Sequence, residues 1–327
     1  MNKAINISNS GQIEMNRALV LAPMEGVTNA PFRLICKETG ADLLYSEFIP
    51  ARSVATGTYK ASQKMYLADE DHPIAIQIFG NDKQMMCEAA KRLEDFGADI
   101  IDLNFGCWVK QVVNNFAGAA FLKDPEKMAE FTAAVADSVN IPVTVKTRLG
   151  WDRDSIVIDK VAPMIEEAGA AALAVHCRTR DMAMQGSADW SYMRDVRKLI
   201  KIPLILNGDV RTPEEAEKAF TETGCDAVMI GRASIGNPFI FQSMRAYLDT
   251  GREPEELSKK QIIGFCLKHL QLSILYKGYP RGLYEFRKHY SGYLNRLHGG
   301  KEIRDKLVLI DDYDIIEKML DEFLYLS

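Results

Sequence analysis

The sequence predicts a (β/α)₈ TIM barrel followed by a smaller all-helical domain. Eight short runs rich in Val, Ile and Leu recur through the first part of the chain, separated by amphipathic segments. Most runs do not alternate between apolar and polar side chains, which is typical of parallel strands covered by helices. Eight βα units in about 240 residues match a barrel in size and rhythm. A doubly wound sheet is the alternative, but it rarely carries eight such regular units.

Each element has its own support in the sequence. Asp124-Pro125 predicts an N-cap followed by proline at the first helical position, and Thr212 to Glu215 resembles a capping box. Glycines lie where helices are expected to stop before the next strand, at Gly97, Gly169 and Gly224. The predicted strands are Ala18–Ala22, Leu43–Ser46, Ile74–Phe79, Ile100–Leu103, Val143–Lys146, Leu173–His176, Leu204–Leu206 and Ala227–Ile230.

The predicted domains are a barrel over residues 1–242 and a helical domain over residues 243–327. Only helical patterns occur in the second region. A polar linker lies within Tyr247 to Ser258, and Gln261 to Tyr276 predicts an amphipathic helix. The acidic stretch Asp311 to Glu322 is interpreted as the solvated face of a last helix.

Composition limits the possible functions. The 327 residues are 47% hydrophobic and carry a formal net charge of −5, so any nucleic-acid contact needs a local basic patch. The six cysteines form no Cys-x-x-Cys pair and no metal spacing with the histidines, which predicts a reduced, cytoplasmic protein without a metal site. No apolar run approaches the roughly 18 residues of a membrane span, so no membrane association is expected. We expect a monomer.

The stretch from Ile100 to Trp108 is the predicted centre of the chemistry. Its apolar run breaks at Asn104 into a turn in which Gly106 allows unusual backbone angles and presents Cys107 beyond the strand. Active sites of α/β proteins lie at such strand ends. A buried structural cysteine is the alternative, because free cysteines pack as small hydrophobes. The polar glycine turn favours a functional thiol.

Polar side chains end nearly every predicted strand, where a barrel places its active site. Each has a structural alternative: Gln77 can cap backbone groups, His176 can be a satisfied core histidine, and Asp209 can cap a helix. Their convergence on one rim nevertheless favours a cofactor site. These strand ends carry Pro23, Met24, Glu47, Gln77, Asn104, Cys107, Lys146, Arg148, His176, Arg178, Asn207, Gly208, Asp209, Gly231 and Arg232.

The ends of the last two strands indicate the kind of cofactor. Asn207-Gly208-Asp209 and Gly231-Arg232 supply backbone N–H groups, a helix N-terminus and a cation, the usual phosphate cradle of a barrel. Lys146 is suited to stabilise a negatively charged ring system, and Gln77 to pair with the amide edge of a ring. Together they suggest flavin mononucleotide (FMN), although the spacing is more specific for phosphate than for flavin.

Several longer motifs form a specific set. They are Leu-Ala-Pro-Met-Glu-Gly-Val-Thr-Asn-Ala-Pro-Phe-Arg (21–33), Ser-Glu-Phe (46–48), Gln-Ile-Phe-Gly (77–80), Val-Lys-Thr-Arg-Leu-Gly-Trp (145–151), His-Cys-Arg-Thr-Arg (176–180), Ala-Asp-Trp (188–190), Asn-Gly-Asp (207–209), Met-Ile-Gly-Arg (229–232) and Arg-Lys-His (287–289). With them the chain resembles the tRNA-dihydrouridine synthases, most closely their bacterial B-type branch, from about residue 21 to about residue 297.

The resemblance implies an FMN enzyme that takes electrons from NADPH and passes hydride to C6 of a uracil in tRNA. It implies that Cys107 protonates C5, as a general acid opposite the hydride donor must. A cysteine, with a pKa near 8.5, can stay protonated at neutral pH. The implied FMN contacts are Pro23, Met24, Glu25, Gln77, Lys146, His176, Asn207, Gly208, Asp209, Gly231 and Arg232. The expected substrate contacts are Asn104, Arg148, Arg178, Arg287 and Lys288.

The chain departs from the family pattern beside Cys107. The family usually has proline where this chain has Trp108, and a glycine-rich loop where this chain has Asn114-Asn115-Phe116, while Lys110 is retained. These differences concern the loop geometry and the choice of uridine. They do not touch the flavin motifs.

A basic and aromatic cluster lies between Lys277 and Lys306. Its eight Lys and Arg residues face three acidic residues, which gives a net charge of +5 with interleaved tyrosines at 276, 279, 284, 290 and 293. Such a mixture suits phosphate contacts and base stacking. The alternative is an ordinary charged helix surface with its tyrosines packed inward.

Two other functions stay open at this stage. One is a flavin barrel that acts on a small pyrimidine-like substrate, although such an enzyme needs neither a helical domain nor a basic cluster. The other is an RNA-binding protein with a degraded active site, suggested by Trp108 and the altered loop at residues 114–116.

Overall fold

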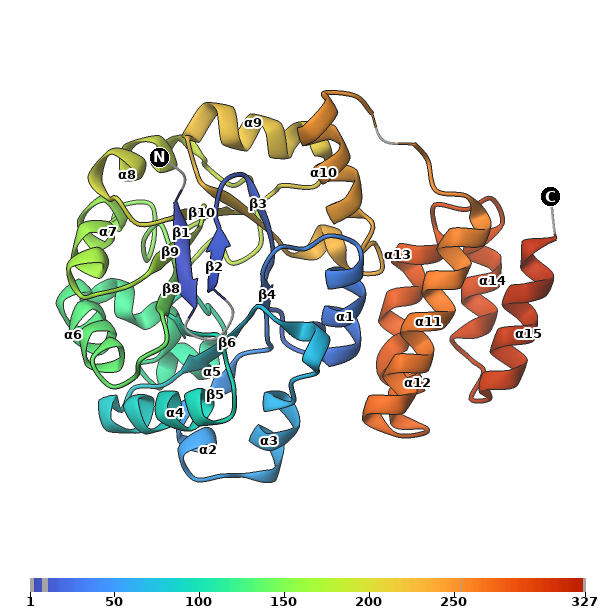
Figure 1. Cartoon of the computed structure of the whole chain (residues 1–327), viewed down its shortest axis with the longest axis horizontal. Coiled ribbons are helices and arrows are strands. Elements are labelled where there is room, and N and C mark those ends of the chain that lie inside the picture. The colour runs from blue at the N-terminus through green and yellow to red at the C-terminus, as the bar shows by residue number, and fades with distance from the viewer. Residues whose placement is uncertain (1–2, 8–10, 254, 326–327) are drawn as a thin grey trace.

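The computed structural model describes residues 3–7, 11–253 and 255–325, which form a barrel with a helical bundle beside it (Figure 1). The strands of the barrel are all parallel, and an isolated bridge between Val20 and Leu43 closes the ring from the first strand to the second. Each predicted run coincides with one barrel strand, so the (β/α)₈ prediction is confirmed. The strands are β3 (Ala18–Leu21), β4 (Leu44–Tyr45), β6 (Ile74–Phe79), β7 (Ile100–Asn104), β8 (Val143–Arg148), β9 (Ala172–His176), β10 (Leu204–Asn207) and β11 (Ala227–Ile230).

Helices surround the barrel, and their ends follow the sequence. The Asp124 carboxylate accepts a hydrogen bond from the Lys127 N–H at 3.1 Å, as predicted for an N-cap. The predicted capping box is only half formed, because the Glu215 carboxylate accepts from the Arg211 N–H instead of returning to Thr212. These helices are α1 (Ala30–Glu38), α2 (Ala51–Ala55), α3 (Tyr59–Met65), α4 (Lys83–Asp95), α5 (Lys110–Asn114), α6 (Pro125–Ala136), α7 (Ile158–Glu167), α8 (Ser191–Leu199), α9 (Pro213–Thr223) and α10 (Ile240–Thr250).

An N-terminal hairpin that the sequence analysis missed covers the lower end of the barrel. It consists of the antiparallel strands β1 (Ala4–Ile7) and β2 (Gly11–Glu14). Ile5, Ile13 and Met15 are buried in one cluster with the apolar side chains that fill the barrel interior. The hairpin therefore closes the end opposite the polar strand ends. A further short strand, β5 (Ile49–Pro50), pairs with β6.

The C-terminal region is helical throughout its described residues, as predicted. The predicted amphipathic helix exists, but it has no single apolar face because it contacts α1 of the barrel and three helices of the bundle. The last helix does bury one side, with Ile316, Leu320 and Phe323 inward. The bundle comprises α11 (Lys259–Lys277), α12 (Arg281–Phe286), α13 (Tyr290–Leu294), α14 (Gly300–Leu307) and α15 (Tyr313–Leu324).

The bundle packs on the side of the barrel next to α1 (Figure 1). Phe32 of α1 stacks on His269 of α11, with ring centres 5.4 Å apart. The backbones also meet closely, since a Cβ on Gly292 would lie 2.2 Å from the Ile235 carbonyl oxygen. Helix α10 packs on α9 with the barrel core. The predicted boundary between residues 242 and 243 falls inside this helix and stays a prediction; part of the predicted linker, Pro254, lies outside the described residues.

Candidate active site

A cavity of about 810 Å³ opens at the C-terminal ends of the barrel strands. It brings together most of the predicted site residues, whereas Arg178, Arg287 and Lys288 do not line it. The predicted residues that line it are Pro23, Met24, Glu25, Gln77, Asn104, Cys107, Lys146, Arg148, His176, Asn207, Gly208, Asp209, Gly231 and Arg232.

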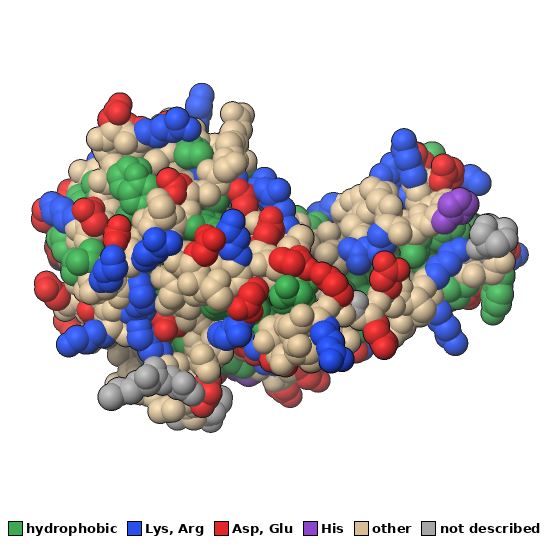
Figure 2. All heavy atoms as spheres, turned by 90° about the horizontal axis from the view of Figure 1, so that it is seen from above, with side chains coloured by type: hydrophobic (Ala, Val, Ile, Leu, Met, Phe, Trp, Pro, Cys, Tyr) green, Lys and Arg blue, Asp and Glu red, His purple; other side chains and the backbone are tan. Residues whose placement is uncertain are grey.

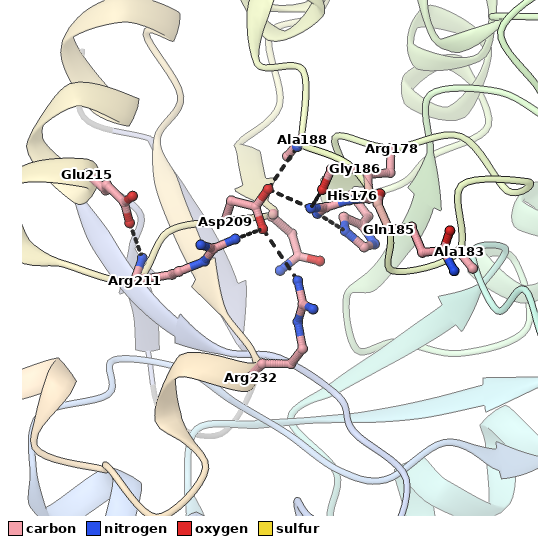
Figure 3. Close-up of polar contacts among 12 residues, drawn as sticks. His176, Arg178, Ala183, Gln185, Gly186, Ala188, Asp209, Arg211, Glu215 and Arg232 are labelled. Atoms are coloured by element: carbon pink, nitrogen blue, oxygen red, sulfur yellow. Dashed lines mark hydrogen bonds and ion pairs between the residues drawn. The ribbon is translucent and has the colours of Figure 1, made fainter. Parts of the chain in front are cut away.

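At one end of the cavity, Asp209 connects three arginines (Figure 3). Its carboxylate lies 2.6 Å from Arg178, 2.7 Å from Arg211 and 3.4 Å from Arg232, and it accepts a hydrogen bond from the Ala188 N–H at 2.8 Å. Burial alone would raise the pKa of Asp209, but these hydrogen bonds outweigh it and lower the pKa to about 2. One carboxylate among three guanidinium groups leaves this end with a net positive charge suited to a phosphate.

Gly208 keeps the same end open. Its φ of +123° is a conformation that side chains rarely adopt, and a Cβ there would lie 2.9 Å from the Ala188 Cβ. The Gly208 carbonyl oxygen accepts a hydrogen bond from the Trp190 indole at 2.8 Å, which fixes the peptide. A ligand can therefore approach the backbone closely here.

His176 is buried and neutral at the cavity wall. Burial, together with Arg148 and other cations, lowers its pKa well below the ordinary value. Its Nε2 lies 3.3 Å from an Arg178 N–H. Because arginine only donates, Nε2 is the acceptor and the ring proton is on Nδ1. The buried Arg178 thus positions His176 and Asp209 without lining the cavity.

Lys146 places a half-buried ammonium in the cavity wall. Burial lowers its pKa to about 8, with a further contribution from Arg148, while Asp102 opposes this change. The group is therefore still mostly charged at neutral pH. A bound anion would hold it in the charged form.

A buried hydrogen-bond chain connects the barrel interior to the Cys107 turn. Thr144 and Gln77 each donate to Asp102 at 2.6 Å, and Asn104 donates to the Gln77 carbonyl oxygen at 2.7 Å. The Asn104 carbonyl oxygen then accepts from the backbone N–H groups of Gly106 and Cys107, at 3.0 and 2.9 Å. Because Asp102 accepts hydrogen bonds, it fixes which way the side-chain amides of Gln77 and Asn104 point. The orientation of Asn104 in turn fixes the position of the Cys107 turn.

We expect Asp102→Asn to disturb this chain although the side chains are nearly equal in size. The new NH₂ group must face one of two partners: the Gln77 amide, which would then turn over or lose its acceptor, or the Thr144 hydroxyl, which would accept and turn its own proton away from residue 102. An unsatisfied buried donor costs about 1–3 kcal/mol, which the free energy of unfolding will report. Thr144→Val is the comparison variant: it leaves one Asp102 oxygen without its donor, a stability loss of the same kind, but keeps the amides in place. Activity therefore separates the two variants, and a D102N variant as active as T144V would contradict the positioning role.

Cys107 lies half-buried on the turn after β7. Burial raises the pKa of its thiol above the ordinary value, more than the Val109 N–H bond and nearby cations lower it. The thiol is therefore protonated at neutral pH. Gly118 packs against the turn with a φ of +57°, and a Cβ there would lie 2.8 Å from the Cys107 carbonyl oxygen. The Arg148 Nε–H donates to the Gly106 carbonyl oxygen at 2.8 Å and braces the turn from the other side.

The two predicted RNA contacts in the bundle differ in position. Arg287 is paired with Asp311 and also donates to the Ile310 carbonyl oxygen at 3.2 Å, so it connects two segments of the bundle. Lys288 donates to the carbonyl oxygen of Gly26, in the loop after β3, and therefore lies at the barrel rim.

The rest of the basic cluster is mixed. Lys277 and Arg281 pair with Glu285, and Tyr290 and Tyr293 are fully buried. Tyr279 and Tyr284 remain exposed. The space-filling view shows acidic and basic side chains intermixed over one face, which is hollowed between barrel and bundle (Figure 2). The alternative interpretation, a charged helix surface with its tyrosines packed inward, thus describes part of this cluster.

Sequence reasoning missed several wall residues. Val109 and Met184 carry no chemical signal in the sequence, and only the tertiary structure brings them to the cavity. Phe48 and Met229 lie within the quoted motifs but were not assigned to the site. Within the described ranges, no group of three His, Cys, Asp or Glu side chains is arranged to hold a metal ion. The same residues include no helix long and apolar enough to cross a membrane.

Comparison with known proteins shows a relationship over nearly the whole chain. The dihydrouridine synthase (Dus) family model matches residues 20–324. A protein named tRNA-dihydrouridine synthase B of Pseudomonas aeruginosa is 39% identical over 304 residues, 93% of this chain and 92% of the relative. The protein of that name from Xanthomonas axonopodis pv. citri is 42% identical over 275 residues, 84% and 83% of the two chains.

Solved structures share the barrel at much lower identity. A mutant of morphinone reductase in complex with tetrahydroNAD is 16% identical with a TM-score of 0.53, over 74% of this chain and 89% of that one. A variant of NCR from Zymomonas mobilis is 16% identical with a TM-score of 0.52, over 79% and 94%. At this identity the likeness concerns the fold.

Proposed function

Because this chain belongs to the dihydrouridine synthase family, we propose that it reduces uridine in tRNA to 5,6-dihydrouridine, with FMN as cofactor and NADPH as electron donor. The observation that carries the proposal is the cavity itself. It places a protonated thiol, Cys107, and a charged amine, Lys146, in one space with a cationic end around Asp209.

The residues present fit FMN. The arginines around Asp209 and the open backbone at Gly208 would hold its phosphate. Lys146 would stabilise negative charge on the ring system, and the amide of Gln77 has a fixed orientation for the ring edge. His176 would donate from Nδ1. Pro23, Met24, Glu25, Asn207, Gly231 and Arg232 are the other proposed contacts.

Side chains of the protein would supply the proton for the reaction and hold the reacting groups in place. A flavin bound in the cavity would supply hydride for C6 of the uracil. Cys107 holds its proton at neutral pH and would deliver it to C5, which a thiolate would fail to do. Asn104 fixes the Cys107 turn through two backbone N–H groups. We place Asn104 and Arg148 at the uracil because both line the cavity beside the thiol.

The bundle is the proposed RNA-binding domain. A uracil in folded RNA is stacked and must be flipped out to enter the cavity, so the enzyme needs a surface that grips the rest of the RNA. The hollow between barrel and bundle is a suitable surface (Figure 2). A tRNA substrate and free cysteines fit action in the cytoplasm.

We expect Lys288→Glu to weaken tRNA binding, because the side chain is exposed at the barrel rim and carries a positive charge there. Loss of one phosphate contact lowers the slope of log K against log salt by about 0.7 to 0.9. Filter binding at several salt concentrations measures this, and flavin content should not change. Arg287→Glu is a poorer test, since the new carboxylate would lie next to that of Asp311 and repel it. An unchanged slope in K288E would leave the bundle without an RNA role at this position.

Purified protein tests the function directly. Protein loaded with FMN, supplied with NADPH and unmodified tRNA, is expected to form dihydrouridine, detected as a mass gain of two hydrogens. Turnover of free uridine but not of tRNA would favour the small-substrate alternative. Tight tRNA binding without turnover would favour the RNA-binding alternative.

A further inference from the structure

A second cavity lies on the same rim of the barrel and shares no residue with the first. It measures about 470 Å³ and lies among the connections that follow β7, β8 and β9. Phe116, Trp151 and Arg180 line it, one from each connection. Asn114 and Phe116, from the stretch after Cys107 that departs from the family pattern, therefore form part of one wall.

Three cations line this cavity, and two of them lie over the ring of Trp151. The Lys123 ammonium lies 3.8 Å from the centre of the Trp151 ring, and the Arg180 guanidinium lies 4.4 Å from it. Lys127 is the third cation. The acidic residue in the lining, Asp124, already caps α6 by accepting from the Lys127 N–H. No ion pair joins these three cations to a carboxylate anywhere in the described ranges, so the cavity is positively charged.

The Arg180 side chain has a nitrogen that lacks a hydrogen-bond partner. Its Nε is buried and has no hydrogen-bond partner. Buried donors in proteins are nearly always paired, and stacking on the Trp151 ring does not satisfy an N–H that lies in the plane of the guanidinium. Because this Nε is also closed off from solvent, an entering ligand reaches the NH₂ groups of the guanidinium instead, and an anion with several acceptor oxygens would bind them with charge-assisted hydrogen bonds. A phosphate is such an anion.

The position of the cavity indicates where this phosphate comes from. Around the barrel, β8 lies four strands from β3, so the cavity faces away from α1 and the bundle (Figure 1). The catalytic cavity opens between the two. Phe116, which is 74% exposed, offers a ring on which an unpaired base can stack. An RNA strand that crosses the opening of the catalytic cavity from the bundle side would reach the second cavity.

We propose that this second cavity binds a phosphate of the RNA strand next to the reacting uridine, with Phe116 stacking on an adjacent base. The inference rests on the proposed function. It gives the enzyme a grip on each side of the flipped nucleotide, with the bundle at one side and Lys123, Lys127 and Arg180 at the other.

The test compares two double variants of the full-length, FMN-loaded protein. Lys123→Gln with Lys127→Gln removes two cavity charges, whereas Lys83→Gln with Lys160→Gln removes two neighbouring surface charges that pair with Glu130 and Glu126. We expect the cavity variant to bind tRNA roughly tenfold more weakly at about 0.1 M salt and to lose about 0.7 to 0.9 from the salt slope, the value for one phosphate contact. Phe116→Ala should weaken binding about fivefold without changing the slope. The control should behave as wild type.

Equal tRNA affinity and slope in the cavity and control variants would overturn the inference. So would a higher KM for NADPH with unchanged tRNA affinity, because the phosphate would then belong to the dinucleotide. A wild-type protein that binds tRNA but makes no dihydrouridine would instead overturn the proposed function. The two failures are therefore distinguishable.

Discussion

Replacing Cys107 with alanine is expected to leave flavin binding intact and to slow dihydrouridine formation by about 10²–10⁴-fold, the usual loss when a general acid is removed. The thiol is protonated at neutral pH, because burial raises its pKa. It lies on a turn held by Asn104 on one side and Gly118 on the other. No alanine atom can replace the proton.

Single-turnover formation of dihydrouridine in tRNA measures the loss, and flavin absorbance confirms that the cofactor site is intact. Cys87→Ala is the matched control, since Cys87 is also half-buried but lies on α4, away from the cavity. A C107A variant that reacts as fast as C87A would mean that another group supplies the proton.

The same thiol predicts a pH dependence. An acid must be protonated to act, so the rate should hold at neutral pH and fall as the pH rises through the raised pKa of Cys107. At saturating FMN, where loss of charge on Lys146 near pH 8 does not empty the cofactor site, Cys107→Ser should lose this alkaline decline, because a hydroxyl keeps its proton throughout the range. A decline that persists unchanged in the serine variant would assign it to another group.

Replacing Lys146 with alanine is expected to weaken FMN binding by about 10- to 100-fold, corresponding to the 1.5–3 kcal/mol of a hydrogen bond to a charged group. The ammonium is half-buried in the cavity wall and forms no ion pair with a carboxylate in the described part of the chain. Burial lowers its pKa to about 8. The wild-type apoprotein should therefore bind FMN best below pH 8 and more weakly above it, as the charge is lost.

Quenching of flavin fluorescence on titration into apoprotein measures both effects. Lys146→Ala should bind FMN weakly with little pH dependence near 8, whereas Lys83→Ala, on the surface of α4, should match wild type. Full flavin occupancy in K146A at low FMN concentration would remove Lys146 from the cofactor site.

The barrel could be predicted because its information is local. Each buried parallel strand is a continuous apolar run, and the residues that end those runs must meet at one rim once the ring closes. The sequence therefore predicts that Gln77, Lys146 and His176 meet in one cavity, as they do. The hairpin of β1 and β2 was missed because four-residue strands carry little pattern, and burial of Ile5 and Ile13 depends on the barrel they cover.

The local sequence pattern does not determine the hydrogen-bond and ion-pair partners of each side chain. Arg178 and Arg287 are predicted substrate contacts, and this role stays a prediction. Their partners, Asp209 and Asp311, could not be predicted, because long side chains reach whichever acid the packing brings near. Asp102 carried no signal, yet it orients two amides beneath the Cys107 turn. The sequence alone settled which residues stand at the rim, since strand order and period decide that. Which of them face the cavity and which brace it depends on distances across the barrel that only the folded chain creates.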